Sequence, residues 1–215
     1  MAISSVAIIP DGTRRWSKRE HVDLAFGYKY AFENLIGQID VLAQRKVNII
    51  HLYLFSIYNL KRTEKEIELC LNAESVFIEK LLGRKYKICI CGDIEKIAKI
   101  NASISDVIKK VYDNRTSYEM PLIYLYIGYS FKNHLEEILR DEKSVSSVIE
   151  TLLKQKVDIV IRTGNAFTLS DFLPIESRYS QIYFLPALFN DFSANDLVKL
   201  CDQYDYECLK LKYGE

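Results

Sequence analysis

The stretch VDIVIRTG, residues 157–164, shows most clearly which fold this chain adopts. Residues 157–161 form a run rich in β-branched apolar side chains, which is typical of a strand buried on both faces. Arg162 follows the run directly, so we expect its side chain at the carboxyl end of the strand. Gly164 permits a tight turn at that point. The stretch therefore predicts a buried strand that brings a cationic residue to the edge of a sheet.

Comparable apolar runs occur elsewhere along the chain and alternate with helical patterns. This alternation predicts an α/β fold with a central, mostly parallel six-stranded sheet and helices on both faces. No internal repeat, linker or change of composition interrupts the chain, so residues 1–215 are expected to form a single domain. The other predicted strands are 6–9, 49–55, 87–91, 122–127 and 181–184, and the predicted helices are 25–45, 63–82, 95–114, 131–139, 145–154 and 193–209.

The charge balance and the apolar runs narrow the range of partners. Lys plus Arg and Asp plus Glu number 29 each, so the formal net charge is zero and a nucleic-acid partner is not expected. The longest uncharged apolar runs, 120–131 and 179–190, hold twelve residues each, too few for a spanning helix, so we expect no stable membrane insertion. The chain opens without a secretory signal pattern and has an odd number of cysteines, which favours reduced thiols and a cytoplasmic location.

The first candidate site follows the first predicted strand, in the sequence PDGTRRW of residues 10–16. Ligands of parallel α/β sheets bind beyond the carboxyl ends of the strands. Gly12 would let backbone N–H groups approach an anion, and Arg14 and Arg15 would supply forked donors that match phosphate oxygens. Asp11 would offer an oxygen to Mg²⁺. These residues indicate a diphosphate site, although a turn with solvated charges has the same composition.

Two further basic clusters follow other predicted strands. One ends in Arg62, and the other begins at Arg162 and continues to Ser170, which we expect to cap a following helix and to donate to a phosphate. Arginines in a cleft need an anionic partner, so three such clusters predict a phosphorylated ligand. Apolar residues nearby suit either plain core packing or the hydrocarbon body of an isoprenoid diphosphate: Tyr53, Phe55, Tyr58, Phe77, Leu81, Tyr126 and Tyr129.

Together these motifs resemble the cis-prenyltransferases, the family that includes undecaprenyl diphosphate synthase. Residues 9–16 (IPDGTRRW) are similar to the family's first motif, M-D-G-N-G-R-W, and residues 25–28 (AFGY) to A-F-G-H. Residues 52–62 (LYLFSIYNLKR) resemble L-Y-A-F-S-S-E-N-W-N-R-P. Residues 157–184 resemble the block D-L-V-I-R-T-G-G-E-x-R-x-S-N-F…E-L-Y-F, and 212–214 lie where the family ends in R-x-G.

The resemblance implies isoprenoid diphosphate substrates, Mg²⁺ as the cofactor and a homodimer. It implies that Asp11 is catalytic and holds the metal while an allylic diphosphate ionises. Ser56, Tyr58 and Asn59 are candidate catalytic residues for proton removal, the released diphosphate is a further candidate, and the choice among them stays open. The implied substrate-binding residues are Gly12, Thr13, Arg14, Arg15, Trp16, Arg62, Gly128, Arg162 and Ser170.

The chain departs from the elongating members of the family at several polar positions. Where those enzymes have Asn, Gly, His, Arg and Glu, this chain has Thr13, Arg14, Tyr28, Thr168 and Gln181. Each lost hydrogen bond to a charged group is worth ~1.5–3 kcal/mol, so these changes make a processive synthase less favourable.

One branch of the family is more similar, the lavandulyl and cyclolavandulyl diphosphate synthases. Its P-D-G-x-R-R-W, G-x-S and F-x-P segments match residues 10–16, 128–130 and 172–174. This resemblance implies condensation of dimethylallyl diphosphate head-to-middle into a branched, lavandulyl-type product. The alternatives are a chain-elongating synthase, a terpene-cyclase-like enzyme and a non-catalytic partner subunit.

Overall fold

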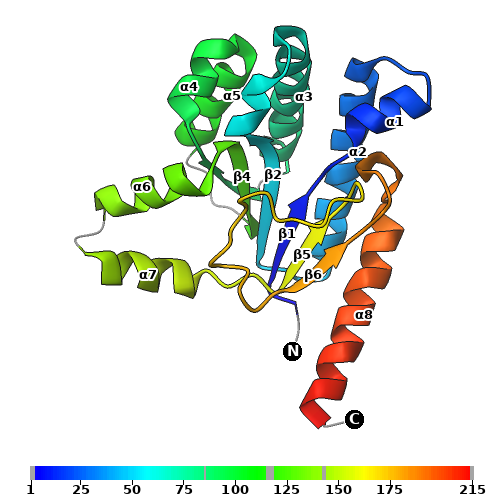
Figure 1. Cartoon of the computed structure of the whole chain (residues 1–215), viewed down its shortest axis with the longest axis vertical. Coiled ribbons are helices and arrows are strands. Elements are labelled where there is room, and N and C mark those ends of the chain that lie inside the picture. Colours follow the sequence, from blue (N-terminus) through cyan, green and yellow to red (C-terminus); the bar gives the residue numbers. More distant parts are fainter. Residues whose placement is uncertain (1–2, 85, 115–118, 142–143, 214–215) are drawn as a thin grey trace.

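Six strands form one sheet in the order β3-β4-β2-β1-β5-β6 (Figure 1). The computed structural model describes residues 3–84, 86–114, 119–141 and 144–213. Every neighbouring pair of strands is parallel, which confirms the predicted α/β sheet and makes it parallel throughout. The strands are β1 (Ser5–Ile9), β2 (Ile49–Ser56), β3 (Tyr86–Cys91), β4 (Glu119–Tyr129), β5 (Ile159–Arg162) and β6 (Gln181–Phe184).

The helices follow the predicted pattern with two differences. A short helix over Thr13–Arg19 was not predicted, and the expected helix over 95–114 is divided at Asn101. Asn101 has an extended backbone, and its side chain accepts from the Ile104 N–H, so it begins the second of the two helices. The helices are α1 (Thr13–Arg19), α2 (Leu24–Gln44), α3 (Glu64–Leu82), α4 (Ile94–Ile100), α5 (Ala102–Asp113), α6 (Phe131–Asp141), α7 (Val145–Lys154) and α8 (Ala194–Tyr213), with single 3₁₀ turns η1 (Ile57–Lys61) and η2 (Phe189–Asp191).

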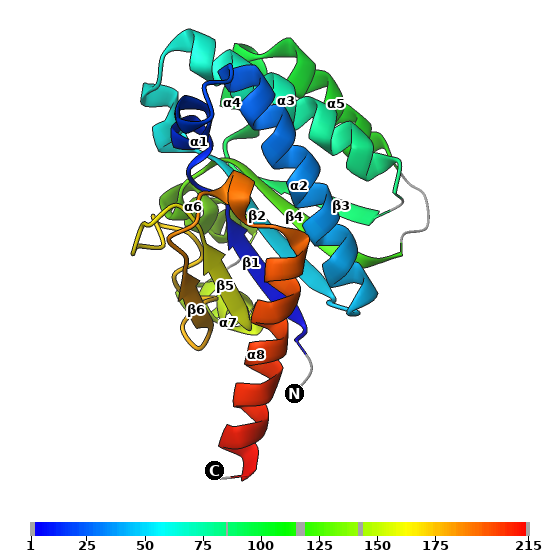
Figure 2. The same cartoon turned by 90° about the vertical axis from the view of Figure 1, so that its right-hand side faces the viewer.

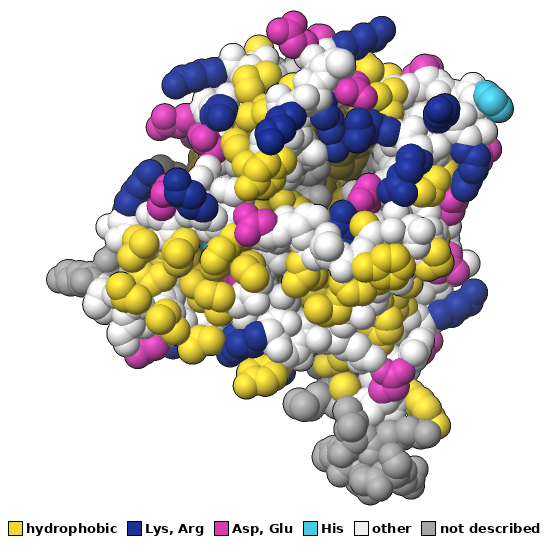
Figure 3. Space-filling view, in the orientation of Figure 1, with side chains coloured by type: hydrophobic (Ala, Val, Ile, Leu, Met, Phe, Trp, Pro, Cys, Tyr) yellow, Lys and Arg dark blue, Asp and Glu magenta, His cyan; other side chains and the backbone are white. Residues whose placement is uncertain are grey.

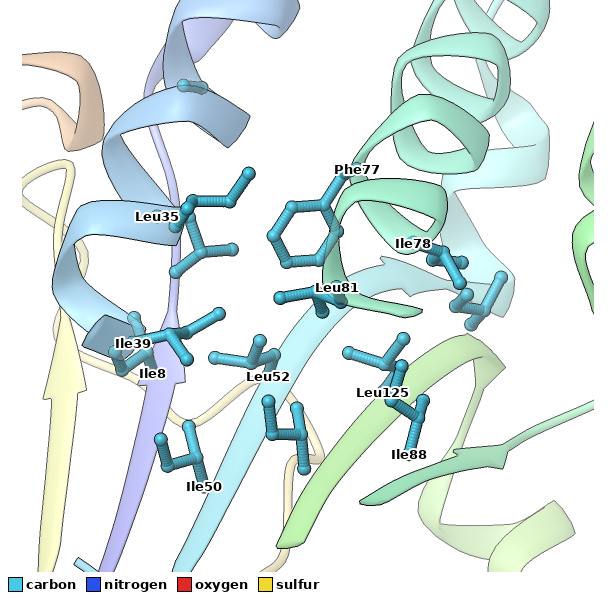
Figure 4. Close-up of a cluster of buried hydrophobic side chains, with 14 of the residues drawn as sticks. Ile8, Leu35, Ile39, Ile50, Leu52, Phe77, Ile78, Leu81, Ile88 and Leu125 are labelled. Atoms are coloured by element: carbon cyan, nitrogen blue, oxygen red, sulfur yellow. The ribbon is translucent and has the colours of Figure 1, made fainter. Parts of the chain in front are cut away.

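The larger hydrophobic core lies between the sheet and helices α2, α3, α5 and α8. Side chains along a strand alternate between the two faces, and Ile50 and Leu52 of β2 point into this core. Figure 4 shows Ile50 below Ile39 of α2, and Leu52 below Leu35 of α2 and Phe77 of α3. The apolar faces of α2 and α3 therefore fix both helices over the middle of the sheet.

The opposite face of the sheet has a smaller aromatic core. Tyr53, Tyr126 and Tyr129 pack there against Phe172, which lies in the segment that follows β5. Figure 2 shows α2, α3 and α5 on one side of the sheet and α6 and α7 on the other. The predicted placement of helices on both faces is therefore confirmed.

No helix in the described part of the chain is long and apolar enough to cross a bilayer.

The family resemblance at residues 212–214 cannot be checked against the structure, since the side chains of 209–213 and residues 214–215 lie outside the described part. Helix α8 begins where it was predicted to begin, because the Ser193 Oγ accepts from the Asp196 N–H.

Candidate active site

The site is built on the turn that joins β1 to α1. Gly12 has a φ of 112°, and a Cβ at this position would lie 2.8 Å from the Leu188 side chain. Only glycine enters this conformation without strain, so Gly12 lets the chain leave β1 and begin α1 at once. The neighbouring residue, Asp11, is thereby held at the carboxyl edge of the sheet.

Asp11 accepts hydrogen bonds from two arginines. Its Oδ2 lies 2.9 Å from Nη2 of Arg162, and its Oδ1 lies 3.3 Å from Nη2 of Arg15. The backbone N–H of Asp11 also donates to Oγ1 of Thr163, at 2.9 Å. Arg15 in α1 and residues 162–163 at the end of β5 therefore fix the carboxylate and the backbone of Asp11 in place.

Arg162 is the last residue of β5 and is nearly buried, with 10% of its side chain exposed. A buried guanidinium needs an anionic partner, and Asp11 provides it. Its Nη1 donates to Oγ of Ser170 at 2.7 Å. Ser170 was predicted to cap a helix as well, and this was wrong, because turns follow it and its own φ is 50°. The backbone there bends back toward Arg162 instead of starting a helix.

Two adjoining cavities open beside Asp11. The first cavity has a volume of about 370 Å³ and the second about 250 Å³. Both cavities are lined by Pro10, Asp11, Leu54 and Arg62, so they are neighbours with these four residues in common. Figure 3 shows dark blue side chains around a hollow in the upper half of the molecule, over the carboxyl ends of the strands.

The first cavity has a cationic mouth and an apolar interior. Its mouth carries four cations, Arg14, Arg15, Lys18 and Arg62. Its interior is formed by α2, β2 and the segment before α8, and its apolar lining consists of Ala31, Phe32, Leu35, Leu54 and Phe189. Arg14 forms an ion pair with Glu66 of α3, with Nη1 and Oε1 3.5 Å apart. This cavity suits a molecule with an anionic head and a short hydrocarbon tail.

The second cavity is more polar. It is lined by the end of β2, by η1, by Arg162 and by Ser170. Asn59 turns its Oδ1 back to accept from the Ser56 N–H, at 2.8 Å, which fixes the start of η1. Burial raises the pKa of Tyr53 to about 12, so this wall residue stays a neutral phenol. The second cavity therefore offers cations and neutral hydroxyl and amide groups to an anion.

Most of the predicted site residues come together in these two cavities. Those that line one or both are Asp11, Gly12, Thr13, Arg14, Arg15, Ser56, Tyr58, Asn59, Arg62, Arg162 and Ser170. Two do not: Trp16 stacks on Tyr30 and donates to Asp191, and Gly128 lies against Ile97 of α4. Roles for Trp16 and Gly128 in binding stay predictions.

Gln181 lies apart from this site within one chain. It begins β6 and pairs in register with Ile159, whereas Phe184 at the other end of the strand pairs with Arg162. Its side-chain amide donates to Glu207 of α8.

Sequence reasoning missed Lys18, Leu35 and Phe189. Lys18 lies one helical turn after Arg14, so a helix prediction for 13–19 would have placed both at the same mouth. Leu35 lies on the apolar stripe of a helix that was predicted. Phe189 reaches the first cavity from a distant segment, and no local pattern indicates that contact.

The residues present fit a magnesium ion bound together with a diphosphate. Among the described residues, Asp11 is the one acidic side chain that lines either cavity. About a third of its side chain is exposed, so its carboxylate is accessible from the cavities. Mg²⁺ commonly takes one or two carboxylates and completes its shell with phosphate oxygens and water. One carboxylate beside a cation-lined cavity that could take a diphosphate meets that requirement.

The fold and the site define a class of protein: a parallel α/β scaffold with two cation-lined cavities at the carboxyl ends of its strands, one of them with an apolar interior. A family model described as "Putative undecaprenyl diphosphate synthase" matches residues 9–211. The chain therefore belongs to this family, the cis-prenyltransferases. This assignment makes it a prenyltransferase.

Known relatives agree with this assignment. An isoprenyl transferase of Helicobacter pylori is 25% identical over 99% of this chain and 97% of its own length. The crystal structure of lavandulyl diphosphate synthase from Lavandula x intermedia, in complex with dimethylallyl diphosphate, has a TM-score of 0.83 at 21% identity and covers 94% of this chain and 95% of its own. A probable undecaprenyl diphosphate synthase from Campylobacter jejuni has a TM-score of 0.71 at 20% identity, with coverages of 94% and 95%.

Proposed function

We propose that this chain condenses two molecules of dimethylallyl diphosphate head-to-middle and releases a branched, lavandulyl-type diphosphate. The observation that carries the proposal is the pair of cavities that share Asp11 and Arg62. Two diphosphates bound in them would have their hydrocarbon parts side by side at Leu54, which lines both. The lavandulyl enzyme named above was crystallised with dimethylallyl diphosphate, which is the substrate we propose here.

The first cavity binds the molecule that ionises. Arg14, Arg15 and Lys18 hold its diphosphate at the mouth, and they stabilise the negative charge that grows as the bond from C1 to oxygen breaks. Asp11 would hold Mg²⁺ together with the leaving diphosphate, and the ion would supply further electrostatic stabilisation of the leaving group when bound. The apolar interior keeps water from the allylic cation.

The second cavity binds the acceptor. Arg162, Ser170 and Arg62 hold its diphosphate, and its double bond attacks C1 of the ionised partner to form the new carbon–carbon bond. The resulting cation loses one proton. Ser56, Tyr58, Asn59 and the released diphosphate all stay candidates for the acceptor of that proton.

The depth of the first cavity favours a short tail. Phe32 of α2 and Phe77 of α3 stack with ring centroids 5.1 Å apart, and Phe77 reaches from α3 toward Leu35 of α2 (Figure 4). Phe32 lines the first cavity and also a separate groove between α2 and α3. Phe32, which Phe77 holds in place from the side of the groove, therefore lies between the two spaces, so a growing chain would have to displace it.

The apolar surface of α6 and α7 supports a homodimer. Leu139, Val145, Ile149 and Leu153 are exposed there, and isolated chains rarely expose such a cluster of large apolar side chains. Figure 3 shows hydrophobic side chains gathered over these helices, at the left of the view. A second copy of the chain is the occupant we propose.

A chain-elongating synthase is the second candidate. Curated relatives with names such as isoprenyl transferase favour it. The groove between α2 and α3, with a volume of about 370 Å³, would also accept a growing chain if the aromatic pair moved apart.

The test is incubation of the purified protein with Mg²⁺ and dimethylallyl diphosphate, with and without isopentenyl diphosphate. The products are dephosphorylated and identified by gas chromatography with mass spectrometry. We expect a branched C10 alcohol from dimethylallyl diphosphate alone. A linear ladder that requires isopentenyl diphosphate would establish elongation, a cyclic product formed without phosphatase would indicate cyclase chemistry, and no product would favour a partner subunit.

A further inference from the structure

Ser170, which accepts from Arg162 at the second cavity, lies in a strained stretch of backbone. The φ angles are 50° at Ser170, 68° at Asp171 and 47° at Leu173. Residues with a Cβ rarely adopt a left-handed backbone, which costs free energy and persists only where the surrounding structure enforces it. The stretch therefore needs contacts that hold Ser170 where Arg162 can reach its hydroxyl.

Contacts with the aromatic core hold the stretch on either side of Asp171. The Tyr53 hydroxyl donates to the backbone oxygen of Ser170 at 3.2 Å. The ring of Phe172 is buried and stacks on the ring of Tyr53, with centroids 4.5 Å apart and planes 3° from parallel. These contacts fix residues 170 and 172 against the sheet, whereas Asp171 between them is exposed.

The Asp171 carboxylate joins this stretch to the start of α6. Its Oδ2 accepts from the Phe131 N–H at 2.9 Å. Phe131 is the first residue of α6, and the first N–H groups of a helix have no partner within it. A carboxylate is also favoured there by the positive end of the helix dipole. Asp171 therefore meets an unpaired donor and ties the Ser170 turn to a helix.

A second contact joins the same segment to α6. His134, one helical turn after Phe131, has its Nε2 3.5 Å from Oε1 of Glu176. Both side chains are buried, and Glu176 has no exposed surface. Helix α6 therefore contacts the segment at residues 171 and 176, so it is a firm support for the Asp171 side chain.

We propose that Asp171 is a positioning residue that holds the Ser170 hydroxyl for a diphosphate in the second cavity, by bonding the first N–H of α6. Ser170 lines the second cavity and Asp171 does not, so Asp171 acts through its neighbour. Arg162 donates to the Ser170 Oγ at 2.7 Å, so displacement of Ser170 would also change the setting of Arg162. The inference rests on the proposed function only in taking Arg162 and Ser170 as diphosphate ligands.

The test measures binding of inorganic diphosphate by calorimetry at a fixed Mg²⁺ concentration, so no turnover is needed. The wild-type protein should show two binding events, and Arg162→Ala identifies the one that belongs to the second cavity. Asp171→Ala should weaken that event about three- to tenfold, the loss typical of one hydrogen bond, and leave the other within about twofold. Asp171→Asn keeps an acceptor oxygen and tolerates a positive φ, so it should bind as the wild type.

Asp171→Gly separates the hydrogen bond from the backbone strain. Glycine adopts a φ of 68° freely but has no carboxylate, so this variant should bind as weakly as Asp171→Ala. The matched control is Asp23→Ala, since Asp23 accepts from the Phe26 N–H at 2.8 Å at the start of α2 and does not line the second cavity. The control should lose a similar amount of stability and keep the wild-type affinity of the second cavity.

A double-variant cycle separates positioning from a general structural effect. Ser170→Ala removes the hydroxyl that Asp171 is proposed to hold, so adding Asp171→Ala should weaken binding in the second cavity no further. Wild-type affinity in Asp171→Ala or Asp171→Gly would overturn the proposal, as would full additivity in the double variant. If Asp171→Ala unfolds early, Asp171→Gly decides alone, because glycine relieves the strain.

The outcome does not depend on which product the enzyme makes, because inorganic diphosphate has no prenyl group. Unchanged binding in Arg162→Ala would refute the second cavity as a diphosphate site and this proposal with it. Failure of the product assay, by contrast, would overturn only the proposed reaction.

Discussion

Asp11 and Arg162 form an ion pair across the junction of β1 and β5, with Oδ2 and Nη2 2.9 Å apart. Register makes this contact possible, because Ile9 at the end of β1 lies opposite Arg162 at the end of β5. A diphosphate in the second cavity would compete with Asp11 for the same guanidinium. Binding of the proposed substrate would thus be coupled to the availability of the Asp11 carboxylate, which is the group proposed to hold the metal.

Replacing Asp11 should separate catalysis from binding. Asp11→Asn retains an oxygen acceptor for Arg162 but loses the charge, so we expect turnover to fall at least about a hundredfold while diphosphate still binds. Asp11→Ala also leaves a nearly buried Arg162 short of its partner, so its free energy of unfolding should fall by about 1–3 kcal/mol. Steady-state rates and denaturant titration measure the two effects. Wild-type turnover in Asp11→Asn would show that the metal site is wrongly assigned.

Arg162→Ala should weaken the acceptor site more than the donor site. Loss of a charge-assisted hydrogen bond is worth ~1.5–3 kcal/mol, so one of two binding events should weaken roughly ten- to a hundredfold. The thiolo analogue of dimethylallyl diphosphate, which resists ionisation, allows calorimetry without turnover. Wild-type protein should bind two equivalents, and the variant one. Equal weakening of both binding events would argue against separate roles for the two cavities.

Phe77→Leu should admit a longer allylic substrate. Phe77 lines the groove of α2 and α3 and stacks on Phe32, which lines both the groove and the first cavity. The smaller side chain should let Phe32 move aside and join the two spaces. We expect kcat/KM with geranyl diphosphate to rise at least about tenfold. Phe55→Leu, a buried change outside both cavities, is the control for general loosening. Unchanged selectivity in Phe77→Leu would mean that another residue limits the tail.

The buried carboxyl of Glu74 predicts a pH-dependent stability difference. Its pKa is about 8 in the folded protein against 4.5 for an ordinary carboxyl, so between these values the folded chain keeps a proton that the unfolded chain has released. Wild-type stability should therefore fall relative to Glu74→Gln as pH rises from about 4.5 to about 8, by up to about 1.4 kcal/mol per pH unit. Cys70, Tyr28 and Arg62, the titratable groups nearest to it, are common to both proteins. Parallel stability profiles would contradict burial of Glu74.

Disrupting the apolar surface of α6 and α7 should dissociate the proposed dimer. Ile149→Asp places a charge in the middle of that surface, so light scattering should show a monomer where the wild-type protein shows a dimer. Lys99→Asp, an exposed change on α4, controls for altered surface charge. A dimer that persists in Ile149→Asp would locate the interface elsewhere.

The strands could be predicted because they are buried on both faces and read as continuous apolar runs. Helix α1 could not, because TRRWSKR is short and mostly polar and is held by packing of Trp16 against α2. Predicting the Asp11–Arg162 pair would have required the register of β1 against β5, which cannot be read from the sequence. Glu74 could have been found: it lies four residues after Cys70, on the same apolar stripe of a predicted helix, where a carboxyl group is out of place.

The head-to-middle bond is tested most directly by nuclear magnetic resonance of the product made from dimethylallyl diphosphate labelled with ¹³C at C1. We predict a C10 product, formed without isopentenyl diphosphate, in which both labelled carbons are attached to one shared unlabelled carbon. That pattern arises only when C1 of one molecule bonds to C2 of the other. Labelled carbons separated by a longer chain, or a product that forms only when isopentenyl diphosphate is added, would contradict it.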